Sequence, residues 1–301
     1  MEGRDLLTLM EYKPNEIKQI IELGIKVKRN PKRYQNALKQ KTLAMLFMKT
    51  STRTRISFEA GMTKLGGHAI YLDWRTTNLT KGRLEEEIRC IDRYVDIIMA
   101  RVYKHEEIQA IAKAAEKPVI NGLCDLFHPC QALADFMTII EKKKTAKGLK
   151  VAFVGDGNNV CNSLAICGAR LGAKIAIATP KGYEPLKAAI DDARNYSEVL
   201  LYNSPEEAVK DADVVYTDTW VSMGQEEETE KRLKIFPPYQ VNAKLMGFAK
   251  KDALFMHCLP AHIGQEVTED VIYSKNSVVF DQAENRMHVQ NALMLKLLGK
   301  A

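Results

Sequence analysis

The sequence predicts an α/β fold made of two doubly wound domains with parallel sheets, joined by helices. Three observations lead to this fold class. Strand and helix patterns alternate along the chain, which is typical of parallel sheets with helical crossovers. Several apolar runs are continuous rather than alternating, as in strands that are covered on both faces. Residues 147–180 read as strand, tight loop, helix and strand, which is a βαβ unit.

The individual elements follow from local patterns. Residues 14–28 place their isoleucines near one helical face, and Pro14 suits the first turn of a helix. We expect helices at 14–28, 56–65, 84–95, 131–144, 183–196, 205–210, 239–250 and 284–298. Besides those of the βαβ unit, we expect strands at 42–48, 68–73, 96–102, 118–123, 213–218, 253–259 and 277–282.

The chain has 301 residues, a length that favours two domains. We expect the first domain to cover residues 1–140 and the second 141–283, with a terminal helix in 284–301.

Composition and charge exclude several classes of protein. The chain is 46% hydrophobic and 27% charged, as in ordinary globular proteins. Its net charge is +6 and its lysines are spread out, whereas nucleic-acid binding usually needs a denser basic patch, so no nucleic-acid partner is expected. No apolar stretch approaches the roughly 18 residues of a membrane span. Because a signal-peptide pattern is also missing, we expect a cytoplasmic protein with no membrane partner.

The six cysteines form no C-x-x-C pair, so the sequence predicts neither a zinc site nor a redox dithiol. Each cysteine is expected to be a small buried side chain. Cys258 is the exception, because it follows an apolar strand at the edge where ligands bind in open sheets.

Residues 47–61 (FMKTSTRTRISFEAG) crowd cations and hydroxyls between a strand and a helix. Lys49, Arg53 and Arg55 lie within seven residues that contain no acid. Cations in a first helical turn oppose the helix dipole, so a capped helix alone does not explain them. A bound phosphate or other small anion does, since free backbone N–H groups and arginine forks both suit it.

Further polar motifs follow other strands. His128 and Gln131 begin a helix in HPCQALAD, while Asp218 and Cys258 follow apolar strands at their carboxyl ends. The loop VGDGNNV (154–160) suggests a dinucleotide fingerprint, but it lacks the third glycine and the acid expected near the end of the next strand. NAD binding is therefore the weaker reading, as is a protease-like Cys–His dyad at Cys258.

Five motifs in order closely resemble the aspartate/ornithine carbamoyltransferase family, and its ornithine branch in particular. They are S-T-R-T-R at 51–55, H-P-C-Q at 128–131, G-D-G-N-N at 155–159, D-T-W-V-S-M-G-Q-E at 218–226 and H-C-L-P at 257–260. The resemblance covers nearly the whole chain. It implies that carbamoyl phosphate and L-ornithine react to give L-citrulline and phosphate, in arginine biosynthesis or catabolism, without a metal or a cofactor. It also implies a homotrimer or a higher assembly of trimers, and a terminal helix that packs back on the first domain.

The resemblance also implies roles for individual residues. The first domain would bind carbamoyl phosphate through Ser51, Thr52, Arg53, Thr54, Asn78, Arg101, His128, Gln131 and Arg286. The second domain would bind L-ornithine through Asn159, Asp218, Ser222, Met223, Cys258 and Leu259. The catalytic groups would be Arg53, Arg101, His128 and Cys258. In this family the loop at 75–87 reaches a neighbouring subunit, and here Asn78 stands where a Gln is usual.

Three alternatives remain open from the sequence. A transcarbamoylase for another amine would share most of these motifs. A phosphate- or nucleotide-binding homologue with weak catalysis would fit the altered loop at 75–87. An NAD oxidoreductase would fit the βαβ unit alone.

Overall fold

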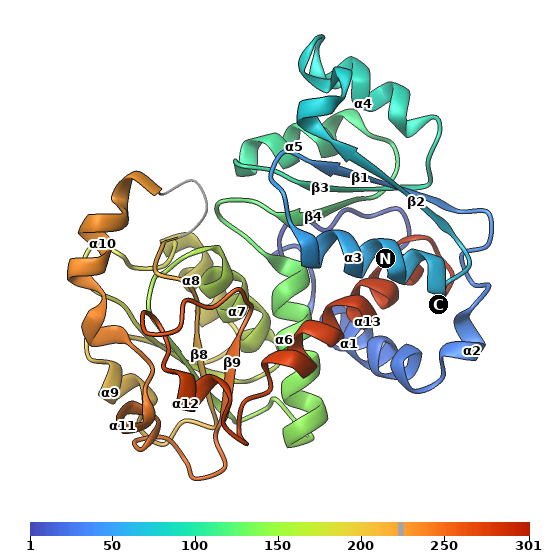
Figure 1. Ribbon diagram of the computed structural model, residues 1–301. Helices are drawn as coiled ribbons and strands as arrows, with labels where there is room; N and C mark the ends of the chain where they lie inside the picture. The colour runs from blue at the N-terminus through green and yellow to red at the C-terminus, as the bar shows by residue number, and fades with distance from the viewer. Residues whose placement is uncertain (222–225) are drawn as a thin grey trace. The chain divides into compact units, whose positions relative to one another are not determined.

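The computed structural model describes residues 1–221 and 226–301, which form two compact units. Unit 1 comprises residues 1–137 and 284–301, and unit 2 comprises residues 138–283 (Figure 1). Two helices cross the division along the chain, namely α6 (Pro129–Lys143) and α13 (Val279–Leu297).

Unit 1 is built on a four-stranded parallel sheet with strand order β2-β1-β3-β4. The order reverses between β1 and β3, so the loops that follow these two strands flank a topological switch point, where open sheets bind ligands. The strands are β1 (Thr42–Phe47), β2 (His68–Asp73), β3 (Ile97–Arg101) and β4 (Val119–Leu123). The helices are α1 (Pro14–Arg29), α2 (Pro31–Tyr34), α3 (Thr52–Lys64), α4 (Leu84–Asp92) and α5 (His105–Ala114), with 3-10 turns η1 (Trp74–Thr76) and η2 (Asn78–Thr80).

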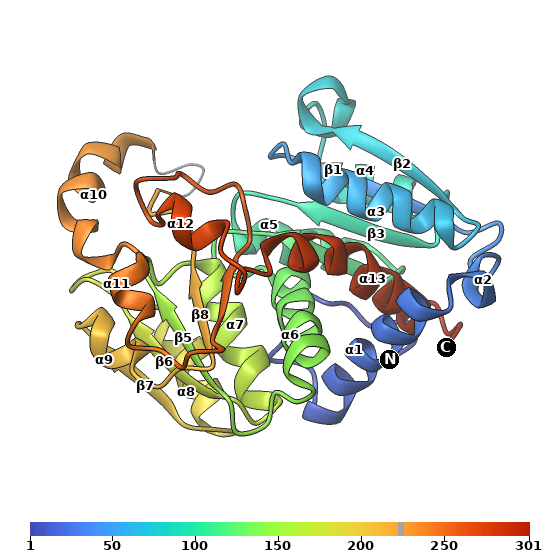
Figure 2. The same ribbon diagram turned by 60° about the horizontal axis from the view of Figure 1, so that its bottom comes forward.

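The last helix, α13, packs into unit 1 beside α1 (Figure 2). A Cβ at Gly24 of α1 would lie 3.4 Å from the Cα of Val289, so this glycine lets the two helices approach closely. Lys28 Nζ also donates a hydrogen bond of 2.8 Å to Asn285 Oδ1. The final helix is therefore part of the core of unit 1.

Unit 2 contains a five-stranded parallel sheet with strand order β7-β6-β5-β8-β9, whose switch point lies between β5 and β8. Its strands are β5 (Lys150–Val154), β6 (Lys174–Ala178), β7 (Val199–Tyr202), β8 (Val214–Thr217) and β9 (Leu254–His257). Its helices are α7 (Asn159–Arg170), α8 (Lys187–Arg194), α9 (Pro205–Val209), α10 (Thr229–Ile235), α11 (Ala243–Met246) and α12 (Glu269–Ile272), with 3-10 turns η3 (Glu226–Glu228) and η4 (Pro237–Tyr239).

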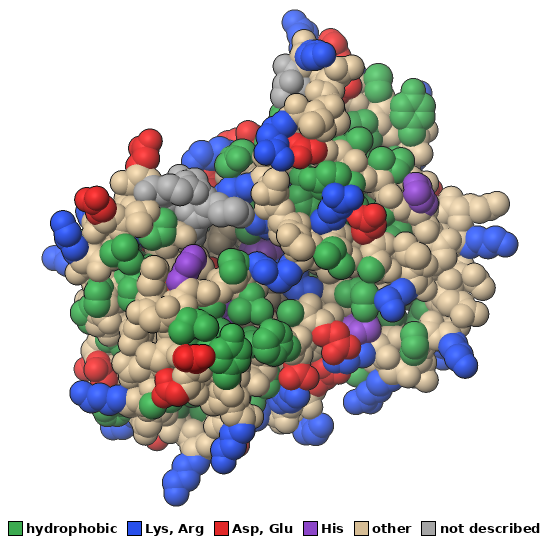
Figure 3. Space-filling model, in the orientation of Figure 1, with side chains coloured by type: hydrophobic (Ala, Val, Ile, Leu, Met, Phe, Trp, Pro, Cys, Tyr) green, Lys and Arg blue, Asp and Glu red, His purple; other side chains and the backbone are tan. Residues whose placement is uncertain are grey.

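The predicted fold class is confirmed: both units are α/β with parallel sheets, and the terminal helix contacts the first. No helix in the described residues is both long enough and apolar enough to cross a membrane. The face in Figure 3 mixes Lys and Arg with Asp and Glu and does not gather them into one stripe.

Several predicted elements need correction. The strand expected at 277–282 is wrong: Val278 donates one backbone bond to Phe255, and α13 then begins at Val279. The helix expected from residue 56 begins earlier, at Thr52, because Ser51 caps it. The helix expected at 239–250 shrinks to α11. Strand β7 and helices α2, α5, α10 and α12 were not predicted.

Candidate active site

The N-terminus of α3 is capped from within S-T-R-T-R. Ser51 has an extended backbone, and its Oγ accepts a hydrogen bond of 3.3 Å from the Thr54 amide. Thr54 is buried, whereas Arg53 is exposed, and the first turn contains no acid. One hydroxyl thus accepts from one N–H group of the helix end, and the first turn carries positive charge from Arg53 and Arg55.

Arg101 and Arg286 meet at Thr54, although they come from distant parts of unit 1. Arg101 is the last residue of β3, where the register with β4 shifts, an irregularity that redirects side chains. Its Nη1 lies 3.5 Å from Thr54 Oγ1, and Nη2 of Arg286 from α13 lies 3.4 Å from the same oxygen. Both arginines are about 5% exposed or less.

Gln131 of α6 is oriented by two partners in unit 1. Its Oε1 accepts a hydrogen bond of 2.6 Å from Arg286 Nη1, and its Nε2 donates one of 2.8 Å to Asp135 Oδ1. Asp135 is fully buried one helical turn further on. The carboxylate therefore fixes which way the Gln131 amide points, a function that sequence reasoning missed.

His128 lies at the start of α6 and is buried. Burial lowers its pKa well below the ordinary value of 6.5, and the charges of Arg286, Arg101 and Arg53 lower it further. The imidazole is therefore neutral at pH 7 and can donate a hydrogen bond without carrying charge. The influence of three arginines on one ring also marks a concentration of positive charge, as an anion site requires.

Asn78 is exposed in η2 and is not among the contacts of this cluster in the described chain. Ser51 and Thr52 help to line a groove of about 750 Å³ whose other lining residues come mostly from α3. Ile56 and Tyr71 also line it, and Ile56 is 59% exposed.

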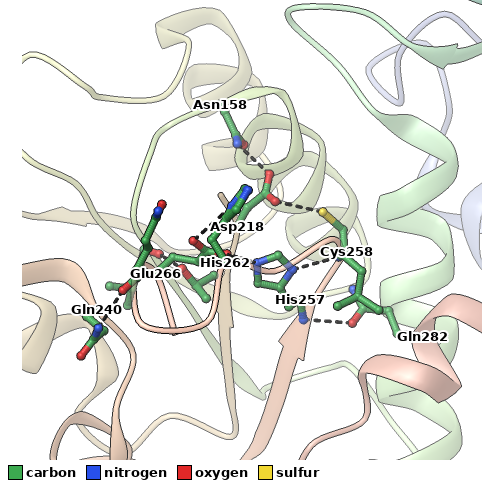
Figure 4. Close-up of polar contacts among 12 residues, drawn as sticks. Asn158, Asp218, Gln240, His257, Cys258, His262, Glu266 and Gln282 are labelled. Carbon is green, nitrogen blue, oxygen red and sulfur yellow. Dashed lines mark hydrogen bonds and ion pairs between the residues drawn. The ribbon is translucent and has the colours of Figure 1, made fainter. Parts of the chain in front are cut away.

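In unit 2, three polar side chains from the loops after β5, β8 and β9 converge (Figure 4). Asn158 Nδ2 donates a hydrogen bond of 2.8 Å to one oxygen of Asp218, and Cys258 Sγ donates one of 3.0 Å to the other. The structure thus brings the two predicted residues Asp218 and Cys258 together at the carboxyl edge of the sheet.

The remaining ornithine-site predictions have different outcomes. Asn159 is half-buried as the first residue of α7, next to Asn158, whose side chain caps the helix and contacts Asp218. Leu259 follows Cys258 and has a φ of +59°. Ser222 and Met223 lie outside the described residues.

The glycine-rich loop after β5 does not leave room for a dinucleotide. A Cβ at Gly157 would lie 2.3 Å from the backbone nitrogen of Pro185, so the chain itself occupies the space above this glycine. In a dinucleotide fingerprint the corresponding space admits the pyrophosphate. The geometry therefore argues against the NAD alternative.

Asp156 in this loop pairs with Arg232 of α10 at 3.0 Å, and both side chains are less than 10% exposed. Arg232 also donates to the Trp220 carbonyl oxygen at 2.8 Å. Burial raises the pKa of Asp156 to about 6, although Arg232 opposes this shift. Arg232 therefore joins α10 both to the loop after β5 and to Trp220, in the segment that begins at Asp218.

Asp218, His257 and Cys258 each offer a metal-ligand atom, and these atoms lie within 4.8 Å of one another. Both ring nitrogens of His257 are already engaged, however, with the Leu259 amide and with Glu266. A metal ion would have to displace one of these contacts, so the donor set does not fit a metal well.

Together, the fold and the arginine cluster define a class: α/β proteins of two parallel-sheet units, with arginines gathered at the carboxyl edge of the first sheet. The carbamoyl-P binding domain model of aspartate/ornithine carbamoyltransferase matches residues 4–141, and the Asp/Orn binding domain model matches residues 147–297. The chain belongs to the aspartate/ornithine carbamoyltransferase family, which makes it a transferase and confirms the resemblance seen in its motifs.

Relatives and solved structures agree with this family. The chain is 55% identical to an ornithine carbamoyltransferase of Pyrococcus horikoshii, covering 99% of this chain and 97% of that protein. It is 50% identical to that of Bacillus subtilis, covering 99% and 95%. The ornithine carbamoyltransferase structure from Pyrococcus furiosus superposes with a TM-score of 0.95 at 54% identity, covering 99% of this chain and 98% of that one.

Proposed function

We propose that the protein transfers the carbamoyl group of carbamoyl phosphate to the δ-amine of L-ornithine, giving L-citrulline and phosphate. Two kinds of support meet here. Relatives at about half identity over their full length are ornithine carbamoyltransferases. The motifs S-M-G at 222–224 and H-C-L-P at 257–260 are those of the ornithine branch.

Residues 1–140 form the carbamoyl phosphate domain in this proposal. The phosphate binds at the N-terminus of α3 through Ser51, Thr52, Arg53 and Thr54, with Arg286 beside it. Arg101 reaches the phosphate and the carbonyl oxygen, His128 binds the carbonyl oxygen, and Gln131 binds the carbamoyl amide. The support is the convergence of Arg101, Arg286 and Gln131 on or near Thr54.

Residues 141–283 form the ornithine domain, and residues 284–301 complete the first domain. Ornithine binds through Asn159, Asp218, Ser222 and Met223, with Cys258 and Leu259 beside the reacting amine. The Asp218 carboxylate, held by Asn158 and Cys258, suits a substrate ammonium group.

The chemistry follows from charge. When the neutral δ-amine attacks, negative charge develops on the carbonyl oxygen and then on the leaving phosphate. Arg53 and Arg101 supply positive charge there, and the neutral His128 donates a hydrogen bond. These groups are preorganised to stabilise the transition state. The amine must first lose its proton, since its ordinary pKa is about 10. The Cys258 sulfur is the protein group expected nearest to it.

The arginine cluster around Thr54 and His128 is the observation that carries this function. The test is carbamoyl transfer from carbamoyl phosphate to a panel of acceptors (L-ornithine, N-acetylornithine, putrescine and L-aspartate), measured for each acceptor by its own carbamoylated product, which is citrulline for L-ornithine. We expect kcat/KM for L-ornithine to exceed that for every other acceptor by at least about a hundredfold. An acceptor that lacks one of the charged groups of ornithine leaves a buried polar group of the site unpaired, and such a substrate is rejected strongly. Preference for another amine would reassign the substrate. Tight carbamoyl phosphate binding without turnover would contradict the proposed reaction and favour the alternative of a phosphate-binding homologue with weak catalysis.

We also infer a homotrimer, or a higher assembly of trimers, in the cytoplasm. The groove along α3 includes Ser51 and Thr52, beside the phosphate site, and its exposed Ile56 suits contact with another subunit. The exposed Asn78 suits a loop that reaches a neighbour's carbamoyl phosphate. A biosynthetic role in arginine formation is supported by relatives from Pyrococcus furiosus and Campylobacter jejuni that are named anabolic.

A pH-dependent effect is expected from Asp156→Asn. The amide mimics a protonated carboxyl group, so variant and wild type differ only where Asp156 is charged, above its pKa of about 6. Above this pH the Asp156 carboxylate pairs with Arg232 and adds negative charge near Asp218. We expect the ornithine KM of the variant to exceed that of wild type by about tenfold at pH 8, and the ratio to approach one as the pH falls to 5. A ratio that stays constant between pH 5 and 8 would contradict this assignment.

A further inference from the structure

The segment that carries Cys258 lies against a buried histidine–glutamate pair. His257 ends β9, Glu266 lies in the chain between Cys258 and α12, and both side chains have no exposed surface. Nε2 of His257 lies 3.2 Å from Oε1 of Glu266 (Figure 4). Isolated charges are costly to bury, so a fully buried carboxylate beside a substrate site needs an explanation.

The hydrogen bonds of His257 define where its proton lies. The backbone amide of Leu259 donates to Nδ1 at 2.8 Å. An amide can only donate, so Nδ1 must carry the lone pair and Nε2 must carry the hydrogen. That hydrogen points to Glu266 Oε1, which also accepts from the His262 amide at 2.6 Å. The carboxylate therefore selects the tautomer that lets Nδ1 accept.

The backbone held in this way is strained. Leu259 has a φ of +59°, in the left-handed region that a bulky side chain rarely adopts. Such conformations persist only where the surroundings enforce them. The Leu259 amide is bound to His257 Nδ1, and the His257 amide is bound to Gln282 Oε1 at 3.1 Å. Cys258 lies between these two anchors, with its thiol on Asp218.

We propose that Glu266 is a positioning residue of the ornithine site, acting through the tautomer of His257. The carboxylate keeps Nδ1 free of hydrogen, Nδ1 holds the Leu259 amide, and this fixes the Cys258 thiol and the strained Leu259 backbone toward the substrate. This inference rests on the proposed function for its substrate. Figure 4 shows His257 between Glu266 and Cys258, so the route from Glu266 to the thiol passes through His257.

Two substitutions distinguish the role of Glu266 as a hydrogen-bond acceptor from its role in filling space. Glu266→Gln keeps an oxygen that can accept from both N–H groups, whereas Glu266→Met keeps the volume and removes the acceptor. We expect Glu266→Met to raise the ornithine KM on the order of 30-fold, as for a buried donor that loses its partner, and Glu266→Gln to raise it by less than about threefold. The Kd for carbamoyl phosphate, measured by calorimetry, should change by less than about twofold in both, because its site is in unit 1.

A matched control is Asp213→Leu. Asp213 is also a buried carboxylate of unit 2, and it accepts from the Lys150 amide at 2.9 Å, but it precedes β8 at the opposite edge of the sheet from Asp218. We expect this control to lower the Tm without a selective change in the ornithine KM. If Glu266→Met and the control changed the ornithine KM equally, the His257–Glu266 pair would have only a structural role, and the proposal would be overturned.

The tautomer itself is tested in two ways. In ¹⁵N spectra of protein labelled at its six histidines, one ring should show a protonated Nε2 that disappears in His257→Asn and changes tautomer in Glu266→Met. His257→Asn also places an amide oxygen where Nδ1 lies, so it accepts from the Leu259 amide without any choice of tautomer. In this background Glu266→Met should add less than about threefold to the ornithine KM, since the coupling between the two positions is gone.

Each result decides the question. A ring that keeps its Nε2 proton in Glu266→Met, or a full 30-fold effect retained in the His257→Asn background, would overturn the proposal. If Glu266→Met does not fold, the spectra of Glu266→Gln still decide, because the proposal requires the wild-type tautomer there. Failure of the proposed function looks different: wild-type protein would form no citrulline, while the spectra would still report the tautomer.

Discussion

Arg53→Ala is expected to reduce kcat/KM for carbamoyl phosphate by about a thousandfold, the scale found when a charged group that stabilises the transition state is removed. Arg53 lies in the first turn of α3, and its charge, like those of Arg286 and Arg101, lowers the pKa of His128. The measurement is steady-state citrulline formation with saturating ornithine and varied carbamoyl phosphate.

Arg55→Ala provides the matched control, two residues further along the same helix. Arg55 Nε donates to Glu59 at 3.1 Å, and its guanidinium lies 3.9 Å from the centre of the Tyr71 ring. Exposed pairs of this kind contribute less than about 1 kcal/mol, so a loss below about tenfold is expected. Similar losses in the two variants, or normal activity in Arg53→Ala, would remove Arg53 from the catalytic groups.

Asp218→Asn should raise the ornithine KM by about a hundredfold while kcat changes far less, because a charge-assisted hydrogen bond to an ammonium group contributes roughly 2–3 kcal/mol. The carboxylate is only 6% exposed and is held by Asn158 and Cys258. Its charge is therefore fixed in place and available to a cation. Initial rates with varied ornithine at saturating carbamoyl phosphate measure the effect.

Asp213→Asn is the control for this prediction, since Asp213 and Asp218 flank the same strand at opposite ends. It should destabilise the fold and leave the ornithine KM within about twofold, because the two sites are separated by the length of β8. An Asp218→Asn variant with a normal ornithine KM would mean that another group binds the substrate amine.

The sequence was sufficient for features that depend on neighbouring residues. Continuous apolar runs predicted β1 and β3 as buried strands, and the hydroxyls of 50–54 predicted a capped helix start, which Ser51 provides. The apolar residues at 278–280 were misread as part of a strand, because local pattern does not reveal that Phe280 is 67% exposed on a helix. A short apolar run fits either element until its partners are known.

Contacts between residues far apart in the chain could not be predicted from the sequence. Nothing local to Asp135 indicates that it orients Gln131 against an arginine 155 positions later. Asn158 and Asn159 are adjacent and identical, so their order alone could not show which one caps α7 and donates to Asp218. Glu266 stands in a polar stretch that resembles a surface loop, and only the fold buries it.

The route of α13 has a consequence for how the protein is made. Residues 138–283 form unit 2 as one continuous segment, whereas unit 1 also includes residues 284–301, which pack against α1. Arg286, which contacts Thr54 in the arginine cluster, is among residues 284–301. Although N-terminal domains generally fold first during synthesis, here unit 1 includes residues from α13, which follow the whole of unit 2 in the chain. Nascent chains therefore acquire the contacts of Arg286 with Thr54 and Gln131 only after α13 has been synthesised.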